Sequence, residues 1–337
     1  MSTEVNMSDV ARRAGVSVAT VSRALRQVGG VSDETRARVR QVASELSYVI
    51  SPEASGLSRQ STGRVAVVVP RMDTWFYATM LSAIEQELRQ ADLDVLLYHI
   101  DGPAERSQFL QELPARRKVD AIVIIALPLP PDQSARLELM GVEVVVAGGR
   151  LRNYPCVHTD DYAIGTTAVG HLADLGHTRI GMIRTSDTDG TEWFSDIERV
   201  RGYRTVLSDR GLPLRPDYLV NVPYSGAAGR EGMLQLLALD ESPTAVFAYS
   251  DEIGLGALSA LRDRGIAVPD EMSLVGVDGH PMGALFGLDT VTQVVEDQGR
   301  QAGEMVLSLL RGQPQQAYEI ITPFTLVLRG STGPPAP

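Results

Sequence analysis

Arginine and small polar side chains gather on one side of a short predicted helix near the start of the chain. Helical spacing turns Val21, Ala24 and Leu25 inward. The outer side then carries Val18, Ala19, Ser22, Arg23 and Arg26. A guanidinium donates two parallel hydrogen bonds to guanine, and small side chains let a helix approach base edges. The pattern indicates a helix that reads a DNA major groove, although the solvated basic face of an ordinary helix has the same composition.

Two more predicted helices brace this one, which is too short to be stable by itself. An apolar stripe at i, i+3, i+4 and i+7 defines the first helix, with Met7, Val10, Ala11 and Ala14. We expect Gly15 to end it, Ser17 to cap the second helix and Ser32 to cap the third. The stripe of the third helix is Val39, Val42, Ala43 and Leu46. The arrangement is typical of a helix-turn-helix unit, but spacing alone leaves a packing unit without DNA equally open.

The exact string distinguishes these two interpretations. The segment DVARRAGVSVATVSRAL, followed by VSDETRARVRQVASELSYV, closely resembles the DNA-binding headpiece of the lactose-repressor and galactose-repressor (LacI/GalR-type) family. The resemblance runs almost unbroken from Met7 to Tyr48. It implies that residues 1–50 form a helix-turn-helix headpiece that binds double-stranded DNA.

By position in that family, the headpiece residues have two roles. Base-edge contacts are expected from Val18, Ala19 and Arg23. Phosphate contacts are expected from Ser17, Thr20 and Ser22. Arg26 and Tyr48 complete the DNA-binding set of the headpiece. Arg23 is the candidate for a bidentate contact to guanine.

Residues 51–63 read as a linker rich in serine, glycine and proline, in which Pro52 can open a short helix. In the resembled family this segment is a hinge helix, and Leu57 falls at the position of a leucine that wedges into the minor groove. Ala54 also matches. Ile50 and Ser55 depart from a usual proline and arginine. An ordinary linker is the alternative.

Charge is distributed unevenly along the 337 residues. Residues 1–60 carry a net charge of +2, whereas the remainder carries −13. A mildly basic end on an acidic body suits a headpiece that confines DNA contact to itself. The single cysteine, Cys156, excludes a disulfide framework and fits a reducing compartment. The longest apolar runs are too short to cross a bilayer, and the start shows no secretory signal, so we expect a cytoplasmic protein without a membrane partner.

From Arg64 onward, short apolar runs rich in β-branched residues alternate with amphipathic helical stretches. The runs are RVAVVVP, DVLLYH, DAIVII, VEVVVA, RIGMI, TAVFAYS and SLVGVD. This alternation predicts an α/β fold with parallel sheets covered by helices on both faces. We expect two such halves, with chain crossings near Asp160, Asp289 and Pro323.

The body resembles the type I periplasmic sugar-binding fold that the same family carries, through HLADLGHTRIGMI, ERVRGYR, AVPDEMSLVGVDG and FTLVLR. The resemblance implies an effector-binding and dimerisation domain over residues 64–330. Its first doubly wound subdomain is expected at 64–160 and 290–322, and its second at 161–289 and 323–330. Residues 331–337 are expected to be a disordered tail.

In open α/β sheets, ligands bind beyond the carboxyl ends of the strands. The candidates at such ends that we take as effector-binding are Trp75, Phe76, Tyr77, Trp193, Arg199, Tyr224, Ser250, Asp251 and Asp278. Arg199 lies three before Gly202, which matches a family R-x-x-G whose arginine bonds effector hydroxyls. Ser250 stands where the family commonly has asparagine. Carboxylates, arginine and aromatic faces together suit a polyol.

Each of these residues could instead have an ordinary structural role. Asp278 can cap a helix, Arg199 can form an ion pair, and the tryptophans can be core or interface aromatics. The five histidines show no metal-ligand spacing, and the sequence lacks a nucleophile elbow, a P-loop and an H-E-x-x-H helix. We therefore expect no metal, no cofactor and no enzymatic activity.

The resemblance as a whole implies a transcriptional repressor that binds a palindromic operator as a homodimer. A small molecule, in the first place a sugar, would control operator affinity. A nucleoside or sugar phosphate as effector, a sugar-binding protein without DNA function and a sugar-modifying enzyme remain alternatives. The tail STGPPAP offers no leucine heptads, so we expect no tetramer.

Overall fold

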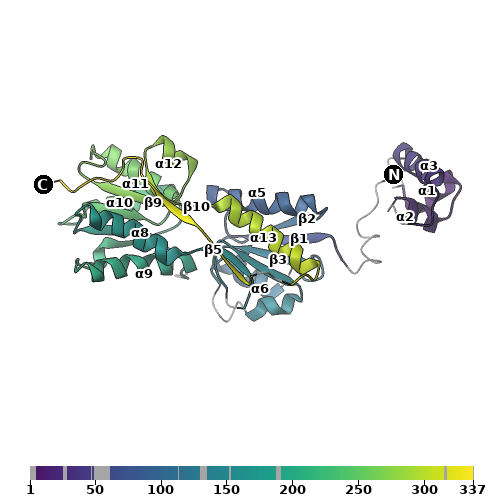
Figure 1. Ribbon diagram of the computed structural model, residues 1–337, viewed down its shortest axis with the longest axis horizontal. Helices are drawn as coiled ribbons and strands as arrows, with labels where there is room; N and C mark the ends of the chain where they lie inside the picture. The colour runs from purple at the N-terminus through teal and green to yellow at the C-terminus, as the bar shows by residue number, and fades with distance from the viewer. Residues whose placement is uncertain are drawn as a thin grey trace. The chain divides into compact units, whose positions relative to one another are not determined.

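The computed structural model describes residues 5–25, 29–46, 48, 61–112, 114–129, 135–151, 153–186, 191–314 and 317–336. It divides the chain into two compact units, residues 1–63 and 64–337 (Figure 1). Arg26, Leu57 and the expected hinge helix lie outside the described residues.

Three helices form the headpiece, namely α1 (Met7–Ala14), α2 (Val18–Leu25) and α3 (Asp33–Glu45). The side chain of Asn6 accepts the amides of Ser8 and Asp9, while Asp9 accepts the amide of Asn6, so a capping box starts α1. Gly15 ends α1 at φ +66°, a left-handed conformation that glycine adopts without strain. Ser32 caps α3 through the amide of Thr35. Local caps therefore fix the helix boundaries.

A small apolar core holds the three helices together. Its buried members are Val10, Ala11, Ala14, Val21, Ala24, Val39, Val42 and Ala43. The helices are only 8, 8 and 13 residues long, and helices of this length are marginal in water, so this shared core must stabilise them. The expected apolar stripes are the ones that face inward.

The core unit contains two six-stranded sheets. Sheet A has the order β11-β5-β4-β3-β1-β2 and is parallel throughout. Its strands are β1 (Arg64–Val69), β2 (Asp94–His99), β3 (Ala121–Ile125), β4 (Glu143–Ala147), β5 (Cys156–Thr159) and β11 (Glu319–Thr322). The helical segments around it are α5 (Trp75–Gln90), α6 (Gly102–Glu112), η1 (Ala135–Met140) and α13 (Val295–Leu310).

Sheet B has the order β12-β10-β9-β8-β6-β7, with only the β10–β12 pair antiparallel. Its strands are β6 (Ile180–Thr185), β7 (Leu219–Val222), β8 (Ala245–Ala248), β9 (Ser273–Asp278), β10 (Asp289–Gln293) and β12 (Phe324–Val327). The helical segments around it are α8 (Asp161–Asp174), α9 (Phe194–Asp209), η2 (Pro216–Tyr218), α10 (Gly226–Leu237), α11 (Asp251–Asp263) and α12 (Pro281–Leu285).

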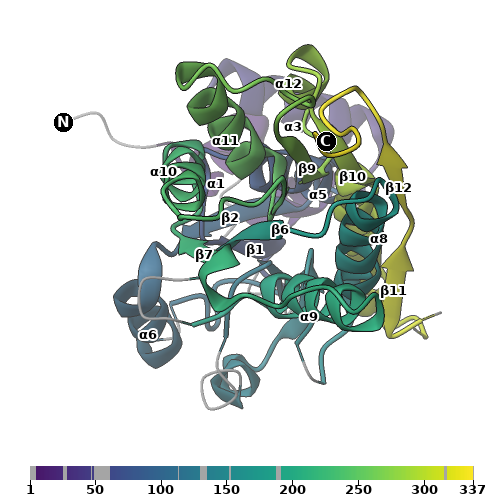
Figure 2. The ribbon, with the colours of Figure 1, turned by 90° about the vertical axis from the view of Figure 1, so that its left-hand side faces the viewer.

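Alternate residues of each strand enter the cores on opposite faces of its sheet. In β8, Ala245 and Phe247 pack with α8 and α9, whereas Val246 and Ala248 pack with α10 and α11. Figure 2 shows these two helix pairs on the two sides of β6. The expected α/β fold with two doubly wound parallel sheets is confirmed. Among the described helices, none is long and apolar enough to cross a membrane.

The chain crosses between the two subdomains three times, and Figure 1 shows the last strands running from one lobe into the other. Two crossings, at Asp160 and Pro323, fall where we expected them. The third lies at Val294, not near Asp289, because β10 continues to Gln293 and pairs with both β9 and β12. Residues 290–293 therefore belong to the second subdomain.

The expected disordered tail was wrong for residues 331–333. Ser331 is 2% exposed, and its hydroxyl donates to Leu274 O at 2.6 Å and accepts the amide of Asp289 at 2.7 Å. Thr332 donates to Asp289, and the amide of Gly333 donates to Ser273. Buried polar groups in sheet B thus require these residues as partners.

We predict that Ser331→Ala destabilises the core, because it leaves the buried amide of Asp289 without an acceptor. The expected loss in free energy of unfolding is about 1–3 kcal/mol. Urea unfolding followed by circular dichroism measures it. Ser208→Ala, at an exposed position of α9, is the control and should change stability by less than about 0.5 kcal/mol. Equal midpoints for the two variants would show that the tail is not a structural part of the core.

Candidate functional site

The second headpiece helix presents its N-terminal turn to solvent. Ser17 Oγ accepts the amide of Thr20 at 3.1 Å and lies 2.8 Å from the Thr20 hydroxyl, which fixes the start of α2. Ser17, Val18, Ala19 and Arg23 are exposed, and Val18 retains 44% exposure although it is apolar. An exposed valine among small residues makes this surface suitable for contact with a partner.

Arg23 folds back along the same helix, where its Nε donates to Ala19 O at 3.3 Å. Ser22 and Thr20 are half-buried at the edge of the surface. Tyr48 packs partly against the headpiece core, so its aromatic ring has a structural contact in addition to any contact with DNA. These positions allow α2 to offer a guanidinium and hydroxyl groups together.

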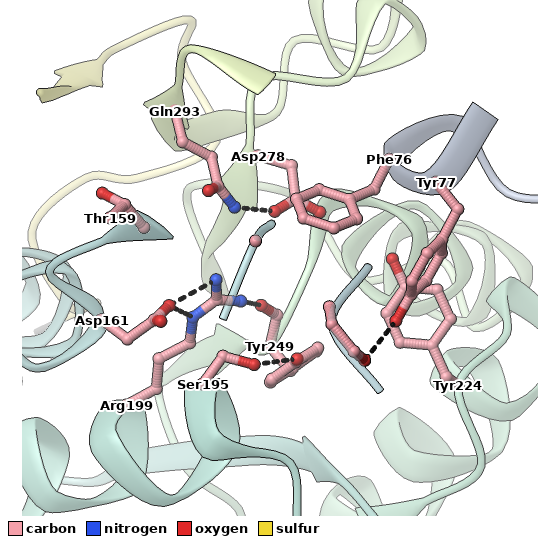
Figure 3. A pocket seen from close by; sticks show the side chains of 12 residues that line it. Phe76, Tyr77, Thr159, Asp161, Ser195, Arg199, Tyr224, Tyr249, Asp278 and Gln293 are labelled. Carbon is pink, nitrogen blue, oxygen red and sulfur yellow. Dashed lines mark hydrogen bonds and ion pairs between the residues drawn. The ribbon is translucent and has the colours of Figure 1, made fainter. Parts of the chain in front are cut away.

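A cavity lies between the two subdomains of the core (Figure 3). The first subdomain contributes Phe76, Tyr77, Ala126, Gly148 and Thr159. The second contributes Asp161, Ser195, Arg199, Tyr224, Tyr249, Asp278 and Gln293. The free volume is about 20 Å³, which holds about one water molecule. The described conformation is therefore too tightly closed for a sugar ring.

Arg199 is the central charged group of this cavity. Its guanidinium donates to Asp161 Oδ1 from Nε at 2.9 Å and to Tyr249 O at 2.5 Å, and it lies 4.6 Å from the centre of the Tyr249 ring. Burial by itself would lower the pKa of Arg199, but the neighbouring groups Asp161, Tyr249 and Asp278 raise it by more than burial lowers it. The net shift of the pKa is therefore upward, and the guanidinium keeps its charge. Burial raises the pKa of Asp161, and Arg199 opposes that shift.

Close helix packing places this pair. A Cβ on Gly165 of α8 would lie 2.6 Å from Arg199 O, and one on Gly202 of α9 would lie 2.6 Å from Tyr162 O. Only glycine lets α8 and α9 approach this closely. Gly202 lies three residues after Arg199, which gives the R-x-x-G spacing a structural reason: the glycine sets the helix contact that brings Arg199 to Asp161.

Asp278 ends β9 and faces the same cavity. Its Oδ1 accepts a hydrogen bond from Gln293 Nε2 at 2.7 Å, as Figure 3 shows. Its φ is +116°, a strained backbone conformation of the kind that clusters at binding sites. Burial raises the pKa of Asp278 well above its ordinary value, although Arg199 opposes the shift. Asp278 is thus a carboxyl group held ready for hydrogen bonding without a full ion-pair partner.

Hydroxyl groups and aromatic faces complete the lining. Burial raises the pKa of Tyr77, Tyr224 and Tyr249, so their hydroxyls remain protonated donors. Ser195 Oγ lies 2.6 Å from the Tyr249 hydroxyl, and Phe76 adds an apolar ring. Donors, acceptors and ring faces in one cavity fit a small ligand that carries both hydroxyls and C–H faces.

Five of the nine expected effector residues line the cavity, namely Phe76, Tyr77, Arg199, Tyr224 and Asp278. The four others take structural positions. Trp75 donates its amide to Glu252 at 2.8 Å, and Trp193 packs in the apolar core of the first subdomain. Ser250 caps α11. Asp251 accepts the amides of Gly279 and His280, and burial raises its pKa to about 7.

Five polar residues of the cavity are not among those expected from the sequence: Thr159, Asp161, Ser195, Tyr249 and Gln293. Thr159, Asp161 and Gln293 flank the chain crossings, and Tyr249 directly follows β8. The rule that ligands bind at the carboxyl ends of strands would have found Thr159 and Gln293 if β5 and β10 had been recognised. The same rule applies to Tyr249, which lies at the end of the expected strand TAVFAYS. Asp161 and Ser195 are brought in by helix packing, which has no local signal.

Comparison with known proteins agrees with both units. Residues 6–51 match the family described as "Bacterial regulatory proteins, lacI family", and residues 169–332 match a "Periplasmic binding protein-like domain". The HTH-type transcriptional regulator DegA of Bacillus subtilis is 30% identical over 335 residues, 97% of each chain. The HTH-type transcriptional repressor CytR of Escherichia coli is 30% identical over 334 residues, 98% of this chain and 97% of that protein.

Solved structures give the same result for the fold. The transcriptional regulator CelR in complex with cellobiose matches with a TM-score of 0.72 and 26% identity, over 97% of this chain and 99% of that chain. The lac repressor dimer bound to operator and the anti-inducer ONPF matches with a TM-score of 0.86 and 24% identity, over 98% and 100%.

A helix-turn-helix headpiece and a two-lobed binding core in one chain define a DNA-binding transcription regulator with an effector-binding domain. Similarity over nearly the full length then gives the family: the chain belongs to the lacI family of bacterial regulatory proteins. The family expected from the sequence is confirmed.

We predict that the contribution of Asp278 to the free energy of unfolding of the core falls as pH rises above about 4. Its pKa is raised in the folded state, so the native protein binds the proton more tightly than the unfolded chain, whose aspartate titrates near 3.8. Asp278→Asn removes this term, so the variant should gain stability relative to the wild type as pH increases.

Urea unfolding between about pH 4.5 and pH 8 measures the difference, with each pKa unit worth about 1.4 kcal/mol. Asp270→Asn, at an exposed position, is the control and should run parallel to the wild type. A constant gap between Asp278→Asn and the wild type would contradict a raised pKa of Asp278 in the folded protein.

Proposed function

We propose that this regulator is a repressor that binds a specific palindromic operator through α2 and releases or holds it according to a small polyol bound between the lobes. The proposal rests on two features that occur in the same chain. One is an exposed helix that carries a guanidinium, and the other is a cavity lined by hydroxyls, carboxyls and aromatic rings. Sugars are the effector class that this lining suits best.

On the DNA side, Val18, Ala19 and Arg23 would meet base edges, while Ser17, Thr20 and Ser22 would bind phosphates. Support comes from the exposure of Ser17, Val18, Ala19 and Arg23 on one helix turn. Arg23 reaches guanine once it leaves Ala19 O, a hydrogen bond that is long at 3.3 Å and exposed. Arg26, Tyr48 and, in the linker, Leu57 complete the proposed contacts.

On the effector side, we favour an uncharged sugar. Arg199 is the single basic residue among the described residues that line the cavity, and it already forms an ion pair with Asp161. Asp278 would repel an anion in its ionised form. A sugar phosphate would therefore meet no free cation there, while a nucleoside, with its ribose and flat base, is the second candidate because Phe76 and Tyr77 offer ring faces. CelR was solved with cellobiose, and a lacI-family regulator of Enterococcus faecium with bound ribose.

Ligand binding would be coupled to movement of the lobes. The cavity holds about 20 Å³, and the lobes are joined across it by the hydrogen bond from Trp75 to Glu252 and by Arg71 over the Tyr224 ring. A sugar must therefore stabilise a more open arrangement, and it shifts the population only through its differential affinity for that arrangement.

The working form would be a homodimer, because two-fold symmetry matches a palindromic site. An exposed apolar surface on α12 and the residue that follows it is a candidate contact for the second copy of the chain. Leu285 is 77% exposed there, and Met282 and Phe286, which are close to it in sequence, are 41% and 46% exposed. Exposed apolar clusters of this kind mark interaction surfaces. We further propose that the protein acts in the cytoplasm, where its operator lies, and catalyses no reaction.

We predict that Arg23→Ala removes most of the preference for the operator over unrelated DNA, because a bidentate contact to guanine contributes about 1–3 kcal/mol of discrimination. Fluorescence anisotropy with operator and scrambled duplexes at one salt concentration measures the ratio of affinities. Arg40→Ala, at an exposed position of α3, removes the same charge and should weaken both complexes alike. An unchanged ratio in Arg23→Ala would remove Arg23 from base readout.

We predict that Asp278→Ala retains operator affinity but loses the response to the effector. A thermal-shift screen of sugars, sugar phosphates and nucleosides on the wild type first identifies the ligand. The loss of a hydrogen bond to a carboxyl group should then weaken its binding about 10- to 100-fold. Asp270→Ala is the control. A normal effector response in Asp278→Ala would show that the ligand binds elsewhere.

A further inference from the structure

Three side chains of types that bind metal ions converge at the edge of sheet A. Cys156 and His158 are two residues apart in β5 and therefore point to the same face of the sheet. Glu319 is the register partner of Cys156 on the adjacent strand β11. One donor atom from each of the three lies within 4.8 Å of the other two. Neither the DNA surface nor the effector cavity uses these groups.

The imidazole of His158 is oriented as a ligand. Its Nδ1 lies 2.7 Å from Thr159 O and its Nε2 lies 2.8 Å from Glu319 Oε1, so both ring nitrogens face acceptors. A neutral imidazole has one N–H and satisfies only one of them. If Nδ1–H donates to the backbone carbonyl, the Nε2 lone pair faces a carboxylate. A backbone carbonyl that holds the other ring N–H is the usual support of a metal-bound histidine.

We propose that Cys156 Sγ, His158 Nε2 and the Glu319 carboxylate bind one divalent cation of the zinc class. Sulfur, imidazole and carboxylate donors at bond lengths of about 2.0–2.3 Å form a tetrahedral zinc site with a fourth position for water. Donor atoms already within 4.8 Å need only small side-chain rotations to reach such bonds. The proton on Sγ leaves to solvent as the Cys156 sulfur binds the ion.

The surroundings of the three residues allow entry. Cys156 is 2% exposed, but the Glu319 side chain is 33% exposed and leads to solvent. Arg150 lies 3.3 Å from Glu319 and competes for it, but the Arg150 side chain is 54% exposed and can turn away. A cation that replaces this exposed ion pair exchanges a weak contact for three coordinate bonds.

The site would act on the connections between the lobes. β5 leads directly to the crossing at Asp160, and β11 leads to the crossing at Pro323. Thr159, at the end of β5, lines the effector cavity. An ion that joins these two strands would therefore stabilise the core by mass action and hold two of the three crossings together.

The test is a titration of the full chain with Co²⁺ in thiol-free buffer, followed by absorption spectroscopy. Cys156 is the single cysteine of the sequence, so a thiolate-to-cobalt charge-transfer band in the near ultraviolet can arise only from it. We expect the band to saturate at one Co²⁺ per chain and to disappear when Zn²⁺ is added. Zn²⁺ should also raise the melting temperature of the wild type.

Variants assign the ligands. Cys156→Ser should abolish the band, and Glu319→Gln and His158→Asn should each weaken binding at least about tenfold. His99→Gln, at an exposed position of β2, is the control and should leave the titration unchanged. The proposal is overturned if the folded wild type shows no charge-transfer band in excess Co²⁺. It is also overturned if both Glu319→Gln and His158→Asn bind with wild-type affinity.

Discussion

The effector domain is organised around one buried ion pair, between Arg199 of α9 and Asp161 of α8. Both side chains are at most 4% exposed, so neither charge can be satisfied by water. Removal of one partner would leave an uncompensated buried charge, at a cost of about 3–5 kcal/mol. The pair is therefore a fixed point from which the rest of the cavity is positioned.

Several features of the fold follow from this constraint. Gly165 and Gly202 bring α8 and α9 close enough for the pair to form. The guanidinium then holds the carbonyl and the ring of Tyr249 at the end of β8. Asp278, on the next strand, faces the same positive group and bonds to Gln293 at the lobe crossing. Movement of one lobe against the other therefore acts on residues that line the cavity.

Local features of this chain could be predicted from the sequence, whereas tertiary ones could not. Gly15 and Ser32 end and begin helices through contacts within a few residues, so their roles could be predicted directly. The buried strands could also be predicted, because an apolar run such as SLVGVD is itself a local signal. Ser250 and Asp251 were placed in the pocket because they follow β8, but helix capping and the amides of Gly279 and His280 turn them away. Asp161 was missed because its partner lies 38 residues away on another helix.

In vitro selection tests most directly whether this chain both recognises a DNA sequence and senses a metabolite. The full chain is used to recover duplexes from a random library, with and without a mixture of sugars and nucleosides. We predict enrichment of one sequence with two-fold symmetric half-sites, and a change in its recovery when the mixture is present. Recovered DNA that cannot be distinguished from the starting library under either condition would contradict it.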